Sequence, residues 1–222
     1  MSKSLIELNK FSKDSKDSKD EDLCVIHKIN KPNVNNLIGT YYTYNKAHKE
    51  AIIHYLKAVD ENCVEAMFNL GQCYTILKDK ENVVKYYKMA INYGHTNSMF
   101  FLGKYYADNS EYTNMINYYL MAIEKGNCYA MNNLGIYYEN ISNYDLMKKY
   151  YLMAIDKGWC DSMYNLAHYY EFNNDLKNMK KYYKMAAKQN DIMSMFALGY
   201  YYARINKFDK LNKYYNMTKN FS

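Results

Sequence analysis

Residues 130–138 read Ala130-Met131-Asn132-Asn133-Leu134-Gly135-Ile136-Tyr137-Tyr138, and degenerate forms of this string recur every 32 residues. The Leu-Gly pair marks the period without an insertion at Ile38-Gly39, Leu70-Gly71, Leu102-Gly103, Leu134-Gly135, Leu166-Ala167 and Leu198-Gly199. A second marker keeps the same period, at Tyr55, Tyr87, Tyr119, Tyr151, Tyr183 and Tyr215. A fixed period of this length is the signature of a repeat architecture. The period divides the chain into units at 34–65, 66–97, 98–129, 130–161, 162–193 and 194–222.

Each unit contains two apolar stripes with helical spacing. Met131, Leu134, Gly135 and Tyr138 fall at i, i+3, i+4 and i+7, and a second stripe begins at Met115 in the preceding unit. Each unit is therefore predicted to be a helix pair. The second helices are expected to end at residues that accept a left-handed conformation. These residues are Gly94, Gly126, Gly158, Asn62 and Asn190.

The other glycines lie inside the first helices, where a glycine costs about 1 kcal/mol relative to alanine. This cost suggests a close helix approach, and we expect the facing residue to be the alanine of the second helix, such as Ala90 or Ala122. The fold class predicted is all-α, an alpha-alpha superhelix (solenoid) of about six 32-residue helix-turn-helix repeats.

The composition argues against catalysis. Pro32 is the single proline, and all eight glycines have a structural role, so none remains for a phosphate-binding loop. The five histidines form no H-x-x-x-H pair, and the five cysteines form no C-x-x-C pair. We therefore expect no enzyme activity, no metal and no cofactor. The odd number of cysteines favours free thiols in a reducing compartment.

The Leu-Gly-x-x-Tyr string of the first helix, followed by Tyr-x-x-Ala in the second, resembles the tetratricopeptide repeat over residues 34–222. The second-helix string Lys-Tyr-Tyr-x-Met-Ala-Ile-x-x-Gly, as in 149–158, also resembles the Sel-like branch. The resemblance implies a right-handed superhelix whose first helices line a concave groove, and hence a protein-protein interaction scaffold or adaptor that binds a peptide or partner helix.

The resemblance also implies the lining of the groove. The first row, two residues before each Leu-Gly pair, is Asn36, Phe68, Phe100, Asn132, Tyr164 and Phe196. The second row is Thr40, Gln72, Lys104, Ile136, His168 and Tyr200, with a rim of Glu139, Asn140, Glu171, Phe172 and Arg204. Buried aromatic anchors would dominate the binding. The alternative, that Phe68 and Phe100 pack between adjacent first helices, stays open.

The charge distribution offers a second hypothesis. Residues 177–222 carry 10 basic and 2 acidic residues, and Lys177, Lys180, Lys181, Lys184 and Lys188 share one predicted helix. Such lysines form either a solvated face or an anion-binding patch, and the patch would make the chain a nucleic-acid-associated repeat protein. The last unit keeps the apolar Tyr215, Met217 and Phe221, which predicts self-association or a partner at this end.

The segment before the repeats differs in character. Residues 12–20 repeat Ser-Lys-Asp without an apolar residue, so 1–22 is expected to be a disordered tail that proteolysis would remove. Ser18 with its trailing acids could instead be a kinase site. Residues 23–33 are a linker or a degenerate capping helix. No apolar stretch has the length of a membrane span, and residues 1–10 lack a signal-peptide core, so we expect a cytoplasmic protein.

Overall fold

The computed structural model describes residues 33–219, and these residues form twelve α-helices and no strand. The predicted tail at 1–22 and most of the predicted linker or cap at 23–33 lie outside the described residues. The helices are α3 (Val34–Tyr44), α4 (His48–Asp60), α5 (Val64–Ile76), α6 (Lys80–Asn92), α7 (Thr96–Asp108), α8 (Tyr112–Glu124), α9 (Cys128–Asn140), α10 (Tyr144–Asp156), α11 (Cys160–Phe172), α12 (Leu176–Lys188), α13 (Ile192–Arg204) and α14 (Phe208–Lys219).

Local sequence sets where the helices begin and end. Many helices begin after a residue whose side chain accepts the backbone N–H three positions on, as Asp79 does from Asn82. Between pairs the backbone is left-handed at Asn62, Gly94, Gly126, Gly158 and Asn190, which confirms the prediction. Within pairs it is also left-handed, at Lys46, Lys78, Ser110, Ser142, Asn174 and Asn206. The residue types at this second set of positions are too varied for the sequence to have predicted the left-handed conformation.

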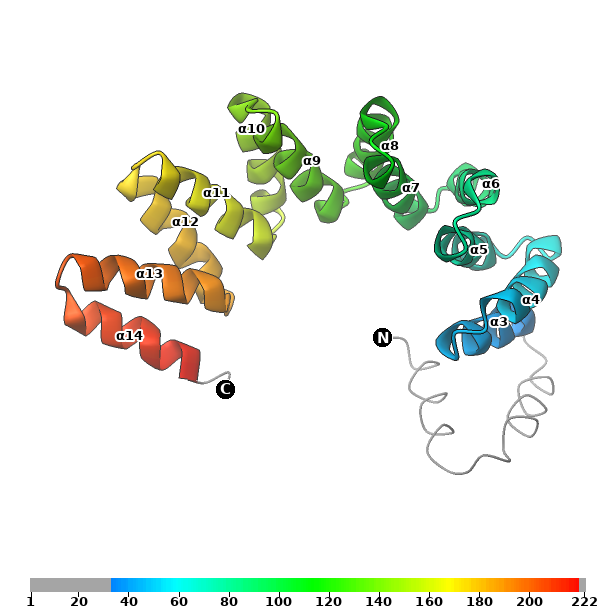
Figure 1. Cartoon of the computed structure of the whole chain (residues 1–222), viewed down its shortest axis with the longest axis horizontal. Helices are drawn as coiled ribbons and strands as arrows, with labels where there is room; N and C mark the ends of the chain where they lie inside the picture. The colour runs from blue at the N-terminus through cyan, green and yellow to red at the C-terminus, as the bar shows by residue number, and fades with distance from the viewer. Residues whose placement is uncertain (1–32, 220–222) are drawn as a thin grey trace. The chain divides into compact units, whose positions relative to one another are not determined.

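The helices pack in chain order, as expected for an all-α helical repeat solenoid. The described residues divide into two compact units, 33–118 and 119–219, with the division inside α8. In the first unit α3 packs on α4 and α4 on α5, and the alternation continues to α7. In the second unit it runs from α9 to α14, where each consecutive pair of helices is in contact (Figure 1).

Five tyrosines of the second helices, one from each of the first five repeats, fill the core of the array. We call them the core tyrosines, and each is at most 2% exposed. They are Tyr55, Tyr87, Tyr119, Tyr151 and Tyr183.

The glycines of the first helices are explained by these rings and not by the alanines predicted to face them. A Cβ on Gly71 would lie 2.6 Å from ring atoms of Tyr87, and one on Gly135 would lie 2.4 Å from the ring of Tyr151. The expectation that Ala90 or Ala122 would face the glycine was wrong for Gly71. The tyrosine ring lies over this glycine and occupies the space that a Cβ would fill.

Candidate partner-binding surface

The tyrosine doublets of the second helices are packing residues. The first member of a doublet stacks on a tyrosine of the first helix, as Tyr86 does on Tyr74, with ring centroids 5.5 Å apart and an interplanar angle of 6°. The second member is the core tyrosine in every doublet except the last, where Tyr215 is exposed. His54 stands where the other repeats have the first tyrosine, and it stacks on Tyr42 with ring centroids 5.4 Å apart. The doublets therefore do not form free stacking platforms for bases.

Two predicted rim residues turn inward to the core tyrosines. The Tyr151 hydroxyl donates to Glu139 at 2.8 Å, and the Tyr183 hydroxyl donates to Glu171 at 2.7 Å. Desolvation, together with the adjacent carboxylate, raises the pKa of Tyr151 and Tyr183 above the ordinary value. The two glutamates thus satisfy buried phenols, and their carboxylates are already engaged.

Three residues of the first predicted row, Asn36, Phe68 and Asn132, lie at the seam between successive first helices, and each contacts the residue 33 positions further on. Asn69 donates to Asn36 at 3.0 Å, Phe68 packs edge-on against Phe101 at 5.3 Å, and Asn165 donates to Asn132 at 3.2 Å. Asn132 is only 8% exposed. The structure thus places Phe68 and Asn132 in packing between helices. Phe100 packs on Phe101, and Tyr164 is half-buried against Tyr183.

The seam contains two serines at equivalent positions, one whose hydroxyl is hydrogen-bonded and one whose hydroxyl is not. Ser162 donates to Asn132 at 2.8 Å, and both side chains are buried. Ser194 is fully buried, but its hydroxyl has no hydrogen-bond partner among the described residues. Asn132 lies 30 positions before Ser162. The residue 30 positions before Ser194 is Tyr164, whose ring provides no amide acceptor.

We therefore expect the same substitution to have opposite effects at the two serines. Ser162→Ala should lower the free energy of unfolding by about 1 kcal/mol, because a buried hydrogen bond is lost. Ser194→Ala should raise it by roughly 1 kcal/mol, because an unpaired buried hydroxyl is removed. Urea unfolding of both variants beside the wild type measures this. A destabilised Ser194→Ala variant would show that its hydroxyl has a partner in solution.

Four of the six residues of the second predicted row are exposed, and those on α11 and α13 share their helices with other exposed apolar side chains. His168 and Phe172 project from α11, and Phe172 is 88% exposed. Tyr200 on α13 is 63% exposed. Both helices pack on α12. The first-helix patch is defined here as Tyr164, His168, Phe172, Met193, Phe196 and Tyr200.

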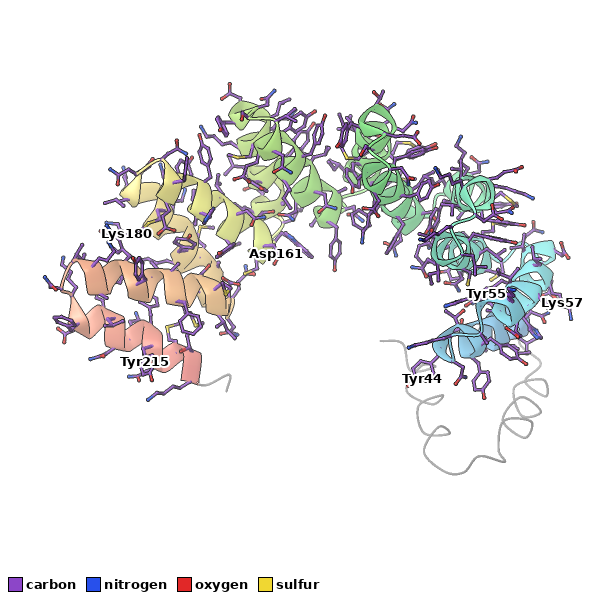
Figure 2. All side chains as sticks on the ribbon, viewed as in Figure 1. Tyr44, Tyr55, Lys57, Asp161, Lys180 and Tyr215 are labelled. Atoms are coloured by element: carbon purple, nitrogen blue, oxygen red, sulfur yellow. The ribbon has the colours of Figure 1, made fainter. Side chains whose placement is uncertain are left out.

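Met193 is a member of the patch that the sequence analysis missed. It is 58% exposed, and it lies three residues before Phe196 and seven before Tyr200, on the same face of α13. That helical spacing could have identified it. The Arg204 guanidinium lies 5.8 Å from the centre of the Tyr200 ring and places a cation at one end of the patch. Asp161 places an exposed carboxylate at the beginning of α11 (Figure 2).

The remaining predicted residues lie on first helices outside this patch. Ile136 on α9 and Lys104 on α7 are exposed, whereas Thr40 and Gln72 are half-buried. Asn140 is exposed at the end of α9. The structure therefore does not bring all the predicted residues into one site, and those on the two units are described separately.

The lysines of α12 lie on or beside aromatic rings. The Lys180 ammonium lies 5.3 Å from the centre of the Tyr201 ring, and Lys181 lies 4.7 Å from the Tyr182 ring. Lys177, Lys184 and Lys188 are exposed (α12 carries the Lys180 label in Figure 2). Cation–π contacts of this kind hold the charge at the surface. These contacts have no feature that favours binding of a nucleic acid over another anion.

Groups able to do covalent or metal chemistry are few in the described range. Residues 33–219 contain no cluster of three or more His, Cys, Asp or Glu side chains that could hold a metal ion. Cys63, Cys73, Cys128 and Cys160 are free thiols, and burial raises the pKa of the Cys160 thiol to about 11. No helix of the described residues has the length and apolar character to cross a membrane.

A shallow hollow of about 570 Å³ lies at the turn between α9 and α10. Tyr144, Asp145, Lys148 and Tyr169 line it, and the Lys148 ammonium lies 5.1 Å from the centre of the Tyr169 ring. Because its lining is mostly polar and solvent-facing, we regard the first-helix patch as the better candidate for binding a protein.

Comparisons with known proteins agree with this fold. A family model for the tetratricopeptide repeat matches residues 64–93 and 161–190. A search of curated protein sequences gave no significant match. Together with the helix-pair packing, these two matches support a helical repeat fold similar to that of tetratricopeptide and Sel1-like repeat proteins.

Solved structures show the same architecture. One is the Sel1 repeat protein from Oxalobacter formigenes, which is 24% identical over 87% of this chain and 89% of that one, with a TM-score of 0.65. A second is c5321, a protective antigen of uropathogenic Escherichia coli with an SLR fold, 18% identical with a TM-score of 0.65. The match covers 89% of this chain and 48% of the antigen. A third is Pseudomonas aeruginosa pilF, 13% identical over 86% and 91% of the two chains, with a TM-score of 0.63.

Proposed function

We propose that this chain is a protein-interaction scaffold that binds an apolar segment of a partner protein on the first-helix patch. The observation that carries the proposal is the exposure of five large side chains on two helices that share one neighbour. Phe172, Met193, Phe196 and Tyr200 are each more than half exposed, and His168, one turn before Phe172, is exposed as well. Soluble proteins rarely leave such a group uncovered without an interaction.

The fold supports this reading. Repeats of the tetratricopeptide and Sel1-like type generally mediate protein–protein interaction and are typically non-enzymatic. A linear array of helix pairs provides an extended surface, and the aromatic side chains of the patch supply anchors of the kind that dominate binding energy. An amphipathic helix or an extended segment with two or three apolar residues fits such a surface.

The experiment begins with a peptide selected by phage display against the immobilised full-length chain. Its affinity is then measured for the wild type, for Phe172→Ala and for Tyr200→Ala. Each variant should weaken binding by about 2 kcal/mol, roughly 30-fold, because each removes an aromatic anchor.

The matched control is Leu152→Ala, which removes an exposed apolar residue from a second helix of the same unit. It should leave the affinity unchanged. Equal losses in the control and patch variants would contradict the proposal. Raising the salt concentration tests the nucleic-acid alternative, which requires a steep loss of affinity for an oligonucleotide, whereas the apolar contacts of the patch require little change.

A further inference from the structure

Tyr215 on α14 is the sixth member of the tyrosine series but is not a core tyrosine. It is 53% exposed, whereas its five equivalents are at most 2% exposed (Tyr55 and Tyr215 are labelled in Figure 2). The preceding Tyr214 is buried and stacks on Tyr202 with ring centroids 5.8 Å apart, as Tyr182 stacks on Tyr170 at the same distance. α14 therefore packs on α13 in the usual register. The exposure of Tyr215 must arise on the other side of α14.

Comparison with α12 shows what is missing on that side. Tyr183, Ala186 and Ala187 of α12 are buried, and α13 packs on this helix. The equivalent residues of α14 are Tyr215, Thr218 and Lys219, and none of these is buried. Within residues 33–219 no helix follows α14 to cover them. We define the outer face of α14 as Leu211, Tyr215, Thr218 and Lys219.

The space that a core tyrosine occupies in other repeats is still open in this one. A Cβ on Gly199 would meet a single side-chain atom, Cδ1 of Leu211, at 3.6 Å. In the equivalent positions a Cβ would lie 2.4–2.6 Å from a tyrosine ring. The glycine that accommodates the ring is thus present, but the Tyr215 ring does not lie against it. A helix packed on the outer face would press the ring into this space, as occurs in the other repeats.

The covering helices of this chain show which residues fit such a face. α13 packs on α12, and its Ser194, Met195 and Leu198 are all buried. The pattern is a small residue, then Met, with Leu three positions later, on one side of a helix. A helix with this pattern matches the shape of the outer face.

Charge decides what kind of helix fits. The Lys219 ammonium lies on the outer face, 4.8 Å from the centre of the Tyr215 ring. Lys210 and Lys213 of the same helix lie over the Tyr202 and Tyr214 rings, Lys207 precedes the helix, and Asp209 is its one acid, so the region around the face has a net positive charge. A helix with acidic flanks would be attracted, and a second copy presenting its own α14 would be repelled. We propose that the outer face of α14 binds an acidic amphipathic helix of another protein, packed as α13 packs on α12. This surface is separate from the first-helix patch.

The probe is a peptide of residues 191–204 with its exposed positions changed by Met193→Glu, Phe196→Glu and Tyr200→Glu. A second peptide carries lysine at these three positions. Both are labelled with a fluorophore and titrated with the full-length chain, and binding is followed by fluorescence anisotropy. The acidic peptide should bind at least about tenfold more tightly than the basic one, and the difference should shrink at high salt.

Variants of the chain locate the binding site. Tyr215→Ala and, as a second variant, Thr218→Asp should each weaken binding of the acidic peptide by about tenfold or more. The matched control Tyr200→Ala removes an exposed tyrosine from the first-helix patch and should change nothing, so that failure of this inference and failure of the proposed function are distinguishable. Circular dichroism checks that each variant is folded.

Three results would overturn the inference. The first is equal binding of the two peptides, or no binding of the acidic one. The second is a dimer in analytical ultracentrifugation of the full-length chain that Tyr215→Ala dissociates, because the occupant would then be a second copy. The third is a Tyr215→Ala variant as unstable as Tyr151→Ala, because a segment of this chain outside residues 33–219 would then cover the face.

Discussion

Replacing Tyr151 with alanine is expected to lower the free energy of unfolding by about 4 kcal/mol, whereas Tyr215→Ala should change it by less than about 1 kcal/mol. Tyr151 is fully buried between α9 and α10, and its ring lies over Gly135. Its removal leaves a large cavity and also deprives Glu139 of its hydrogen-bond donor. Tyr215 is equivalent in sequence position but is 53% exposed.

Urea unfolding followed by circular dichroism measures both variants. Because a repeat array is stabilised by contacts between neighbours, amide hydrogen exchange should show the loss of protection centred on α9, α10 and α11. Similar stability of Tyr151→Ala and the wild type would mean that the core tyrosine is not the element that joins the helix pair.

Alkaline pH is expected to destabilise the chain, because its buried tyrosines hold their protons more tightly in the folded state than in the unfolded state. Burial raises the pKa of Tyr87 to about 12 from the ordinary value of 10.0, and it raises the pKa of Tyr55, Tyr151 and Tyr183 as well. Above pH 10 the unfolded chain releases these protons while the folded chain retains them. The stabilisation is therefore complete below pH 10 and is lost as the pH rises through the folded-state pKa values.

The loss is large. For Tyr87 alone a shift of two pKa units corresponds to about 3 kcal/mol between pH 10 and pH 12. Tyr55, Tyr151 and Tyr183 add to it, and the whole free energy of folding of a domain is only about 5–15 kcal/mol. The urea midpoint should thus fall steeply from about pH 10 upward.

The matched variant is Tyr151→Phe, which cannot ionise. Its stability near neutral pH should be lower by about 1–2 kcal/mol, since Glu139 loses its donor, but its stability should decrease less with pH. A wild-type midpoint that stays constant up to about pH 12 would show that the phenols are not protonated core groups.

The candidate surface was only partly predictable from the sequence. The second predicted row is largely exposed, since His168 and Tyr200 lie opposite the apolar stripe of their helices. The first row could not be separated from the packing between repeats. Phe196 is exposed and Asn132 is buried at the same repeat position, because their exposure depends on whether another first helix lies alongside. Helical periodicity describes one helix and contains no information about such neighbours.

The sequence by itself determined the repeat, the helix pairs and the turns between pairs. The 32-residue period and the apolar stripes are local, and Gly94, Gly126 and Gly158 adopt the left-handed conformation that they were expected to adopt. Only the tertiary structure decided what each repeated residue does. The same tyrosine is a core residue at position 183 and an exposed one at position 215, because burial requires a covering helix. Likewise the sequence indicates that Glu139 and Glu171 are surface charges. In the folded chain each accepts a hydrogen bond from the core tyrosine on the other helix of its pair.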